Sequence, residues 1–292
     1  MSTSIAFHGT GIMGTRMAPR LLAAGFPLTA YNRTPDRAAP LADLGARLAK
    51  TPADAARDAD VLIAMLADDV ASREVWLGHH GALNTARPGT VCIECSTLTV
   101  PWVRELAADC TARQLLFLDA PVLGTKPHAA SGQLTFLVGG NAGTLEAVRP
   151  VFAPMAKDVV HLGPVGSGVM VKLLNNFLAG VQAASFAEAL ALLQRSGVNP
   201  QSALAVLTEG AAGSPIIKTL NTRHAARDYA PNFPLRLMAK DLAYILAEGK
   251  HHGLTLQTAT AALFRFTQAA NAGLADQDMS ALLKFLEQTS HA

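Results

Sequence analysis

The feature that most constrains the fold is a glycine-rich turn between a short apolar run and a helical pattern. Residues 4–7 read as a strand, GTGIMG follows at residues 9–14, and the next segment reads as a helix that stops at Gly25. Glycines at these spacings permit a tight turn, and they let backbone N–H groups approach a pyrophosphate at the positive end of the helix. Because a strand precedes the turn and a helix follows it, the motif strongly indicates dinucleotide binding.

Further strand patterns follow, separated by helical segments such as residues 101–113. This alternation predicts an α/β fold with a Rossmann-type, doubly wound, mostly parallel sheet over residues 1–163. Ligands of such sheets bind beyond the carboxyl ends of the strands, where a nicotinamide ring would meet Met65, Leu66, Ser96 and Thr97. The expected strands after the first are residues 27–31, 60–66, 91–95, 115–118 and 133–139.

Two interpretations remain open for the residues that follow the strand at 91–95. Ser96 and Thr97 can lie at the ligand site, or they can cap the next helix, because serine and threonine are favoured at both places.

The segment at residues 163–176, GPVGSGVMVKLLNN, marks a change in the pattern. Only helical patterns follow, so we expect an all-α domain over residues 164–292, entered through a long inter-domain helix of roughly 45 Å. The apolar faces of this helix are wide enough for burial on several sides, including against a second subunit, so we expect a homodimer or homotetramer. The expected helices are residues 165–195, 200–209, 214–224, 234–249, 256–273 and 278–288.

Charge and composition exclude several classes of partner. The net charge is +2 with Lys and Arg scattered, so the chain lacks the basic stripe that a nucleic-acid binder needs. The first residues lack the charged and apolar regions of a signal peptide, and the most apolar segment, residues 169–193, carries Lys172, Asn176 and Glu188. We therefore expect a cytoplasmic protein with no membrane span.

Cysteine and histidine pairs give no indication of a metal or disulfide site. Cys92 and Cys95 lie at an odd spacing on a predicted strand, which sends their side chains to opposite faces. The histidine pairs at residues 79–80 and 251–252 lie in polar loops and have no third ligand at helical spacing. We expect no bound metal and no disulfide framework.

The residues after the second strand bear on the choice of dinucleotide. Asn32, Arg33 and Thr34 stand where an NAD-selective site usually places an acidic residue for the ribose 2′-hydroxyl. A 2′-phosphate requires instead that the carboxylate be absent and a cation present, so the sequence favours NADPH over NADH. Thr34 and Pro35 can also cap the next helix as N-cap and first helical residue, and both interpretations can hold.

The loop DAPVLGTKPHAASGQL, residues 119–134, leaves one predicted strand and enters another. Backbone N–H groups of a Gly and a Thr at its tip can bind an anion, and Lys126 can add positive charge. The alternative is an ordinary turn with a solvated Lys126.

Lys172 and Asn176 lie one helical turn apart, so they share one face of the long predicted helix. Hydride delivery to a carbonyl makes an alkoxide, which a lysine ammonium can stabilise and protonate. A lysine on a helix is usually a solvated surface residue. Here the otherwise apolar segment, just after a glycine turn, favours a catalytic role instead.

Six separated motifs line up in order with one family. GTGIMG, YNRT, ECST, DAPVLGTKPHAASGQL, GPVGSGVMVKLLNN and FPLRLMAKDL together resemble the β-hydroxyacid dehydrogenases over nearly the whole chain. YNRT, GTKPHAASGQL and FPLRLMAKDL look most like the NADPH-dependent glyoxylate/succinic semialdehyde reductases. The 3-hydroxyisobutyrate dehydrogenases more often carry an acidic residue where Asn32 stands.

The resemblance implies NADP as cofactor, a small aldehyde acid as substrate, Lys172 as the catalytic residue and Asn176 as a substrate-orienting partner. Leu123 departs from the family, because it stands where a serine usually donates a hydrogen bond to the substrate carboxylate. The other expected substrate-binding residues are Ser96, Gly124, Thr125 and Phe233. The expected dinucleotide-binding residues are Gly9, Thr10, Gly11, Ile12, Met13, Gly14, Asn32, Arg33, Thr34, Met65, Leu66, Thr97 and Lys240.

Three other functions are compatible with this architecture. A 3-hydroxyisobutyrate-type dehydrogenase using NAD is the first, and Arg33 speaks against it. Imine reductases and a non-catalytic NADP-binding scaffold are the others, and Lys172 speaks against both, because neither needs this proton donor.

Overall fold

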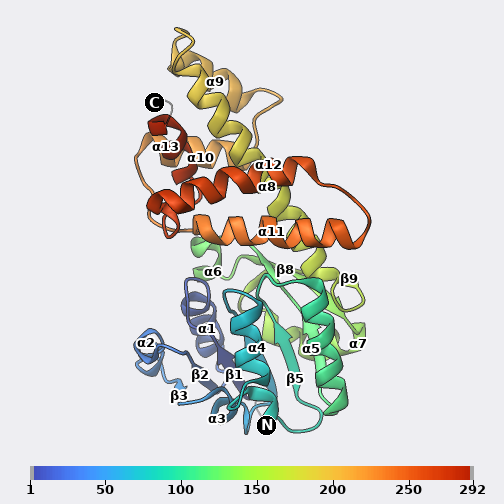
Figure 1. Ribbon diagram of the computed structural model, residues 1–292. Coiled ribbons are helices and arrows are strands. Elements are labelled where there is room, and N and C mark those ends of the chain that lie inside the picture. The colour runs from blue at the N-terminus through green and yellow to red at the C-terminus, as the bar shows by residue number, and fades with distance from the viewer. Residues whose placement is uncertain (1–2, 290–292) are drawn as a thin grey trace. The chain divides into compact units, whose positions relative to one another are not determined.

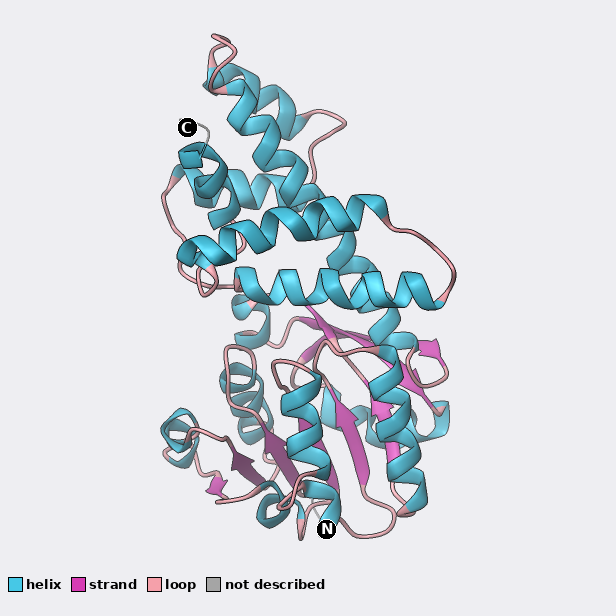
Figure 2. Ribbon diagram, in the orientation of Figure 1, coloured by secondary structure: helices cyan, strands magenta, loops and turns pink. Residues whose placement is uncertain are grey.

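The computed structural model describes residues 3–289 of the chain. The chain divides into two compact units, Met1–Lys172 and Leu173–Ala292 (Figure 1). The first unit has a central sheet with helices around it, whereas the described part of the second unit is helical (Figure 2). The predicted order of an α/β unit followed by an all-α unit is confirmed.

A nine-stranded sheet runs through the first unit in the order β3-β2-β1-β4-β5-β6-β8-β7, with β9 paired to β8. Strands β1 to β6 pair in parallel, whereas β8 runs antiparallel to β6 and β7. The doubly wound, mostly parallel sheet expected from the sequence is therefore confirmed. The strands are β1 (Ile5–His8), β2 (Leu28–Tyr31), β3 (Arg47–Leu48), β4 (Val61–Ala64), β5 (Val91–Glu94), β6 (Leu116–Asp119), β7 (Val122–Leu123), β8 (Leu134–Gly140) and β9 (Ala156–Gly163).

Helices cover both faces of this sheet. Ile5 and Phe7 of β1 share a core with residues of α1 and α7. On the opposite face, Trp76 of α4 donates a hydrogen bond to Glu94 of β5. The helices of the first unit, with their short 3₁₀ turns, are α1 (Gly14–Ala23), η1 (Pro35–Arg37), α2 (Ala39–Ala42), α3 (Pro52–Ala56), α4 (Asp69–Leu77), η2 (Ala82–Asn84), α5 (Val100–Ala112), α6 (Lys126–Ala130) and α7 (Ala142–Phe152).

Three strands were not predicted from the sequence. β3 and β7 contain two residues each, which is too short to show a pattern. β9 includes the exposed pair Lys157 and Asp158, because it lies at an edge of the sheet and is only half buried. Patterns based on buried apolar runs therefore miss it.

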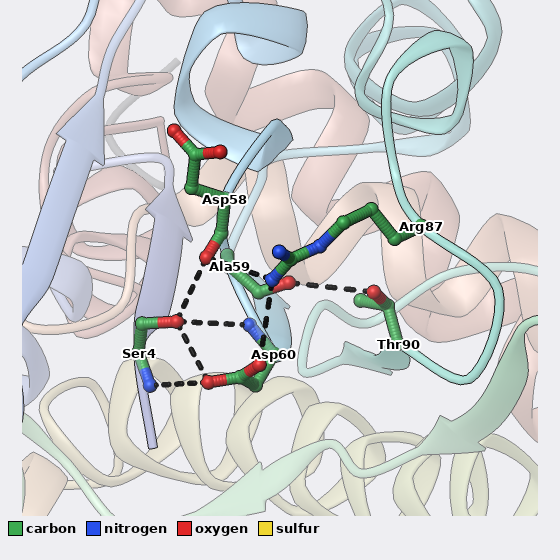
Figure 3. Close-up of polar contacts among 6 residues, drawn as sticks. All are labelled: Ser4, Asp58, Ala59, Asp60, Arg87 and Thr90. Carbon is green, nitrogen blue, oxygen red and sulfur yellow. Dashed lines mark hydrogen bonds and ion pairs between the residues drawn. The ribbon is translucent and has the colours of Figure 1, made fainter. Parts of the chain in front are cut away.

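The amino ends of three parallel strands are joined by polar contacts (Figure 3). Ser4 Oγ lies within hydrogen-bond distance of two acceptors, Asp60 Oδ2 (2.8 Å) and the carbonyl of Asp58 (2.9 Å). Arg87 donates to the Asp58 carbonyl, and Thr90 donates to the carbonyl of Ala59. These bonds hold together the segments that enter β1, β4 and β5.

The second unit packs its helices around a core that includes Phe186, Leu242, Phe266 and Leu282. The predicted helix at residues 256–273 corresponds to α12 and the π-helical turn that follows it, in which Gly273 adopts a left-handed φ of 87°. The helices are α8 (Ser167–Leu193), which begins in the first unit, α9 (Pro200–Glu209), α10 (Pro215–Ala225), α11 (Leu235–His251), α12 (Gln257–Ala269), η3 (Ala270–Leu274) and α13 (Ala281–Thr289).

The first turns of α8 belong to the α/β unit. The buried Asp119 carboxylate at the end of β6 accepts hydrogen bonds from the backbone N–H groups of Gly166 (2.8 Å) and Val169 (2.9 Å). A carboxylate in this position satisfies N–H groups that a helix start leaves unpaired. The first unit therefore extends to Lys172, beyond the boundary at residues 163 and 164 that we expected from the sequence.

Helix α8 is also long and apolar enough, by length and composition alone, to cross a membrane. However, Ala183, Phe186, Ala187 and Leu190 of this helix contribute to the core of the second unit. This part of α8 is therefore a core helix of the second unit.

Candidate active site

The glycine turn after β1 fits a bound dinucleotide. Gly9 has a φ of +96°, and a Cβ there would overlap the carbonyl oxygen of Met65. A Cβ on Gly14 would overlap the carbonyl oxygen of Gly9, so both residues must be glycine for the turn to close. A Cβ on Gly11 would meet no atom within 4 Å, which leaves room for a phosphate beside the backbone.

Thr10 and Asn32 join this turn to the end of β2. The Thr10 N–H donates to Asn32 Oδ1 (3.0 Å), and Asn32 Nδ2 donates to the carbonyl of Thr34 (2.8 Å). The buried Thr10 hydroxyl finds no hydrogen-bond partner among the described residues. A buried unpaired hydroxyl is costly, so a ligand oxygen at this turn would satisfy it.

The predicted residues Ile12 and Met13 continue the turn into α1. The carbonyl of Ile12 accepts a hydrogen bond from Arg16 Nη1 (2.6 Å), and Met13 occupies the N-cap position of α1. Their backbones therefore lie where a dinucleotide phosphate would meet the helix start.

Arg33 and Thr34 lie on the surface after β2. Thr34 occupies the N-cap position of η1 with Pro35 first in the turn, as expected, but its side chain accepts no capping hydrogen bond. Arg37, at the end of η1, is a second exposed cation that the sequence analysis did not single out.

The ends of β4 and β5 meet through Ser96. The Leu66 N–H donates to Ser96 Oγ (2.7 Å), and the same hydroxyl donates to buried Glu94 Oε1 (2.5 Å). The N-cap of α5 is Thr99, whose hydroxyl accepts from the Trp102 N–H. The alternative in which Ser96 or Thr97 caps this helix is therefore wrong.

The expected carboxylate-binding loop has its own internal contacts. Gly124 has a φ of +125°, which favours glycine, and half-buried Leu123 belongs to β7. The Thr125 N–H and hydroxyl both lie within hydrogen-bond distance of His128 Nδ1 (3.2 and 3.0 Å). His128 is thus a polar neighbour of this loop that we did not assign from the sequence, and Lys126 is half buried beside it.

Asn176 and Lys240 come together on a residue that we did not select from the sequence. Asn176 is buried, and its Nδ2 donates to Asp241 Oδ2 (2.5 Å). Lys240 Nζ lies 3.1 Å from Asp241 Oδ1 and 5.0 Å from the ring centre of Tyr244. In the sequence, only the position of Asp241 directly after Lys240 in MAKDL could have pointed to it. The contact between Asp241 on α11 and Asn176 on α8 is tertiary and leaves no local pattern.

Lys172 is half buried on α8, one turn before Asn176. Residues four apart on a helix lie on the same face, so the ammonium and the amide are neighbours along α8.

Phe233 is held by its backbone. Its N–H donates to Asp278 Oδ2 (3.0 Å), and its carbonyl accepts from the Met279 N–H (2.9 Å). The half-buried ring packs against the core of the second unit. Asp278 is therefore a supporting residue that the sequence did not reveal.

Three ionisable residues lie buried at the carboxyl end of the sheet, namely His8, Glu94 and Asp119. Burial lowers the pKa of His8 to about 4, so its imidazole is neutral at pH 7. Burial also raises the pKa of Glu94 and Asp119, while hydrogen bonds to each carboxylate oppose that rise.

Among the described residues, no group of three or more His, Cys, Asp or Glu side chains could hold a metal ion. This includes the cysteine and histidine pairs noted in the sequence. Cys92 contacts Cys110 on α5, whereas Cys95 packs into the core on the other side of the sheet. His79 and His80 contact one another on the surface.

A glycine turn of this geometry on a doubly wound sheet defines a dinucleotide-binding protein. Residues 4–163 match the family model of the NAD-binding domain of 6-phosphogluconate dehydrogenase. Residues 166–286 match the family model described as the NAD-binding domain of NADP-dependent 3-hydroxyisobutyrate dehydrogenase.

Relatives and solved structures match nearly the whole chain. The NAD-dependent L-serine dehydrogenase of Pseudomonas aeruginosa is 34% identical over 98% of both chains. The chloroplastic glyoxylate/succinic semialdehyde reductase 2 of Arabidopsis thaliana is also 34% identical, over 98% of this chain and 80% of its own length. The structure of Mycobacterium tuberculosis 3-hydroxyisobutyrate dehydrogenase with L-serine has a TM-score of 0.89 at 33% identity, covering 98% of this chain and 99% of its own.

The chain therefore belongs to the 3-hydroxyisobutyrate dehydrogenase family, whose members are oxidoreductases that act on hydroxyl or aldehyde groups with a nicotinamide dinucleotide. The glycine turn, the room at Gly11 and the unpaired Thr10 hydroxyl fit that cofactor.

Proposed function

We propose that this protein is an NADPH-dependent reductase that converts small aldehyde acids of the glyoxylate or succinic semialdehyde type to hydroxy acids. The observation that carries the proposal is the placement of Lys172 and Asn176 one helical turn apart on α8, where Asp241 accepts a hydrogen bond from the Asn176 amide. A proton donor beside an oriented amide is what carbonyl reduction needs from the protein.

Lys172 would donate a proton from its ammonium to the carbonyl oxygen as that oxygen gains negative charge, and solvent would then reprotonate it. The bound nicotinamide supplies the hydride to the carbonyl carbon. Asn176 would orient the substrate, because Asp241 accepts from its Nδ2 and the amide cannot rotate without losing that bond. In the oxidative direction the neutral amine of Lys172 would accept the proton instead.

The preference for NADPH is supported by Arg33. It lies exposed after β2, and Asn32 replaces the acidic residue that would accept from a ribose 2′-hydroxyl. Asn32 already donates to the Thr34 carbonyl and accepts from the Thr10 N–H, so it shapes the turn instead. Arg37 adds a second exposed cation at η1.

The choice of aldehyde acids as substrates is supported by the motif resemblance. Overall identity does not favour either activity, because the L-serine dehydrogenase and the glyoxylate/succinic semialdehyde reductase are both 34% identical to this chain. Gly124 and Thr125 are the proposed carboxylate-binding loop, and Lys126 can add charge. Leu123 offers no hydroxyl, so the pocket would favour an apolar group at that position. Oxidation of a 3-hydroxyisobutyrate-type or serine-type hydroxy acid is the second candidate, favoured by the similarity to the M. tuberculosis enzyme.

We further propose that the enzyme is a cytoplasmic homodimer or homotetramer. Leu174, Leu178 and Leu192 of α8 are 44%, 58% and 71% exposed. Several exposed leucines along one helix usually mark a surface that a partner covers. Light scattering tests this directly, and a monomeric mass would remove the proposal.

The first experiment measures NADPH and NADH oxidation with glyoxylate, succinic semialdehyde, methylglyoxal, tartronate semialdehyde and a cyclic imine, and NAD(P) reduction with L-serine and 3-hydroxyisobutyrate. Turnover of aldehyde acids with NADPH is the expected result. Lys172→Ala should lower kcat at least about a hundredfold while NADPH binding persists. Near-normal kcat in this variant, or activity on the imine alone, would refute the proposed function.

A further inference from the structure

The Glu94 carboxylate is buried at the end of β5 and is saturated with donors. Oε2 accepts hydrogen bonds from Ser72 Oγ (2.7 Å) and Trp76 Nε1 (2.8 Å) of α4. Oε1 accepts from the Ser96 N–H (2.9 Å) and from Ser96 Oγ (2.5 Å). The side chain is fully buried, so this number of partners compensates for the cost of removing a carboxylate from water.

This carboxylate is linked to the dinucleotide turn through an unbroken set of contacts. Ser96 Oγ, which donates to Glu94, accepts the Leu66 N–H (2.7 Å). The Met65 backbone, which leads into Leu66, lies directly against Gly9, since a Cβ on Gly9 would overlap the Met65 carbonyl oxygen and meet the Leu66 side chain at 2.9 Å. Without the Ser96 hydroxyl, the Leu66 N–H loses its partner where β4 ends.

We propose that Glu94 is a positioning residue of the dinucleotide site: it fixes the Ser96 hydroxyl so that this hydroxyl holds the Met65–Leu66 backbone against the glycine turn. This role rests on the proposed function, of which it concerns only the dinucleotide site. It does not depend on Lys172 or on the identity of the substrate. Ser96 then supports the cofactor-binding backbone, whereas we expected it from the sequence to contact substrate.

The network also explains why a carboxylate occupies this position. Each Glu94 oxygen faces one group that can only donate, the Ser96 N–H on one side and Trp76 Nε1 on the other. A glutamine amide would turn its NH₂ toward one of these donors in either orientation. Glu94→Gln therefore changes the hydrogen bonding while keeping nearly the same shape.

The test is a double-mutant cycle of Glu94→Gln and Ser96→Ala, read by NADPH and NADH fluorescence titration without substrate. Each variant should raise the Kd for both dinucleotides about tenfold, as expected for the loss of one hydrogen bond to a charged group. Because the two residues act through one contact, the double variant should bind no more weakly than the weaker single variant. The NADPH/NADH ratio should stay as in the wild type.

Ser4→Ala is the matched control, because the Ser4 hydroxyl also bonds to a carboxylate and a backbone N–H, both of Asp60, at the amino ends of the strands (Figure 3). It should lower Tm and leave both Kd values unchanged. If Ser96→Ala likewise lowers Tm without changing either Kd, Glu94 has only a structural role and the proposal is wrong. If Glu94→Gln does not fold, the Kd and Tm of Ser96→Ala still distinguish a positioning role from a structural one. The Kd and Tm measurements do not depend on which substrate the enzyme reduces.

Discussion

Asn176 on α8 donates a 2.5 Å hydrogen bond from Nδ2 to Oδ2 of the buried Asp241 on α11. The other Asp241 oxygen lies 3.1 Å from Lys240 Nζ, so one carboxylate contacts a proposed substrate residue and a proposed cofactor residue. A change at Asp241 should therefore affect both binding and catalysis.

Replacing Asp241 by Asn should lower kcat/KM about tenfold or more, because the new amide can face the Asn176 NH₂ with a donor and no longer balances Lys240. Steady-state kinetics with varied substrate and varied NADPH check this. Asp276→Asn is the matched control, since Asp276 pairs with Arg236 on the surface with 87% of its side chain exposed. Equal kinetics in the two variants would contradict the role given to Asp241.

Arg33→Asp should reduce the preference for NADPH over NADH at least about tenfold, because a carboxylate would repel the 2′-phosphate and could accept from a 2′-hydroxyl. The ratio of kcat/KM for the two dinucleotides is the measurement. Lys157→Asp makes the same charge change on the exposed edge strand β9 and should leave the ratio unaltered. An unchanged ratio in Arg33→Asp would remove the NADPH assignment.

Gly11→Ala and Gly14→Ala should separate the effect of these glycines on NADPH binding from their effect on stability. A methyl group at residue 11 meets no protein atom within 4 Å, so Tm should hold while the Kd for NADPH rises at least about tenfold. At residue 14 the methyl group would overlap the Gly9 carbonyl, so this variant should lose stability even without ligand. Tight NADPH binding by Gly11→Ala would show that the phosphates lie elsewhere.

His8 should make the protein sensitive to acid. Its folded pKa is about 4 against 6.5 in the unfolded chain, so below pH 6.5 the unfolded state binds a proton that the native state does not. Stability from this residue is therefore fully present above pH 6.5 and is lost as the pH falls toward 4, by about 3 kcal/mol in total.

Urea unfolding at several pH values between 7.5 and 4.5 measures this, with His8→Gln as the comparison. The free energy of unfolding of the variant should fall less steeply over that range than that of the wild type. Parallel curves for the two proteins would contradict the lowered pKa.

Much of the fold followed from local patterns. β1, the glycine turn and α1 were predictable because a buried strand, fixed glycines and an amphipathic helix each leave a local signature. The edge strand β9 and the two-residue strands β3 and β7 were not, because their residues are polar or too few to form a pattern. The antiparallel return of β8 also depends on pairing between distant segments.

The sequence by itself determined the chemistry available: a glycine turn, a cation in place of an acidic residue after β2, and a lysine one helical turn from an asparagine. Spacing along a helix or strand sets those relationships, so they can be read without coordinates. Only the tertiary structure decided which partners hold those groups. Asp241 lies 65 residues from Asn176, Asp119 lies 47 residues from Gly166 at the start of α8, and Glu94 lies 22 residues from its partner Ser72 on α4. Burial selects such carboxylates, because each must find donors once water is removed, and that requirement appears only when the chain is folded.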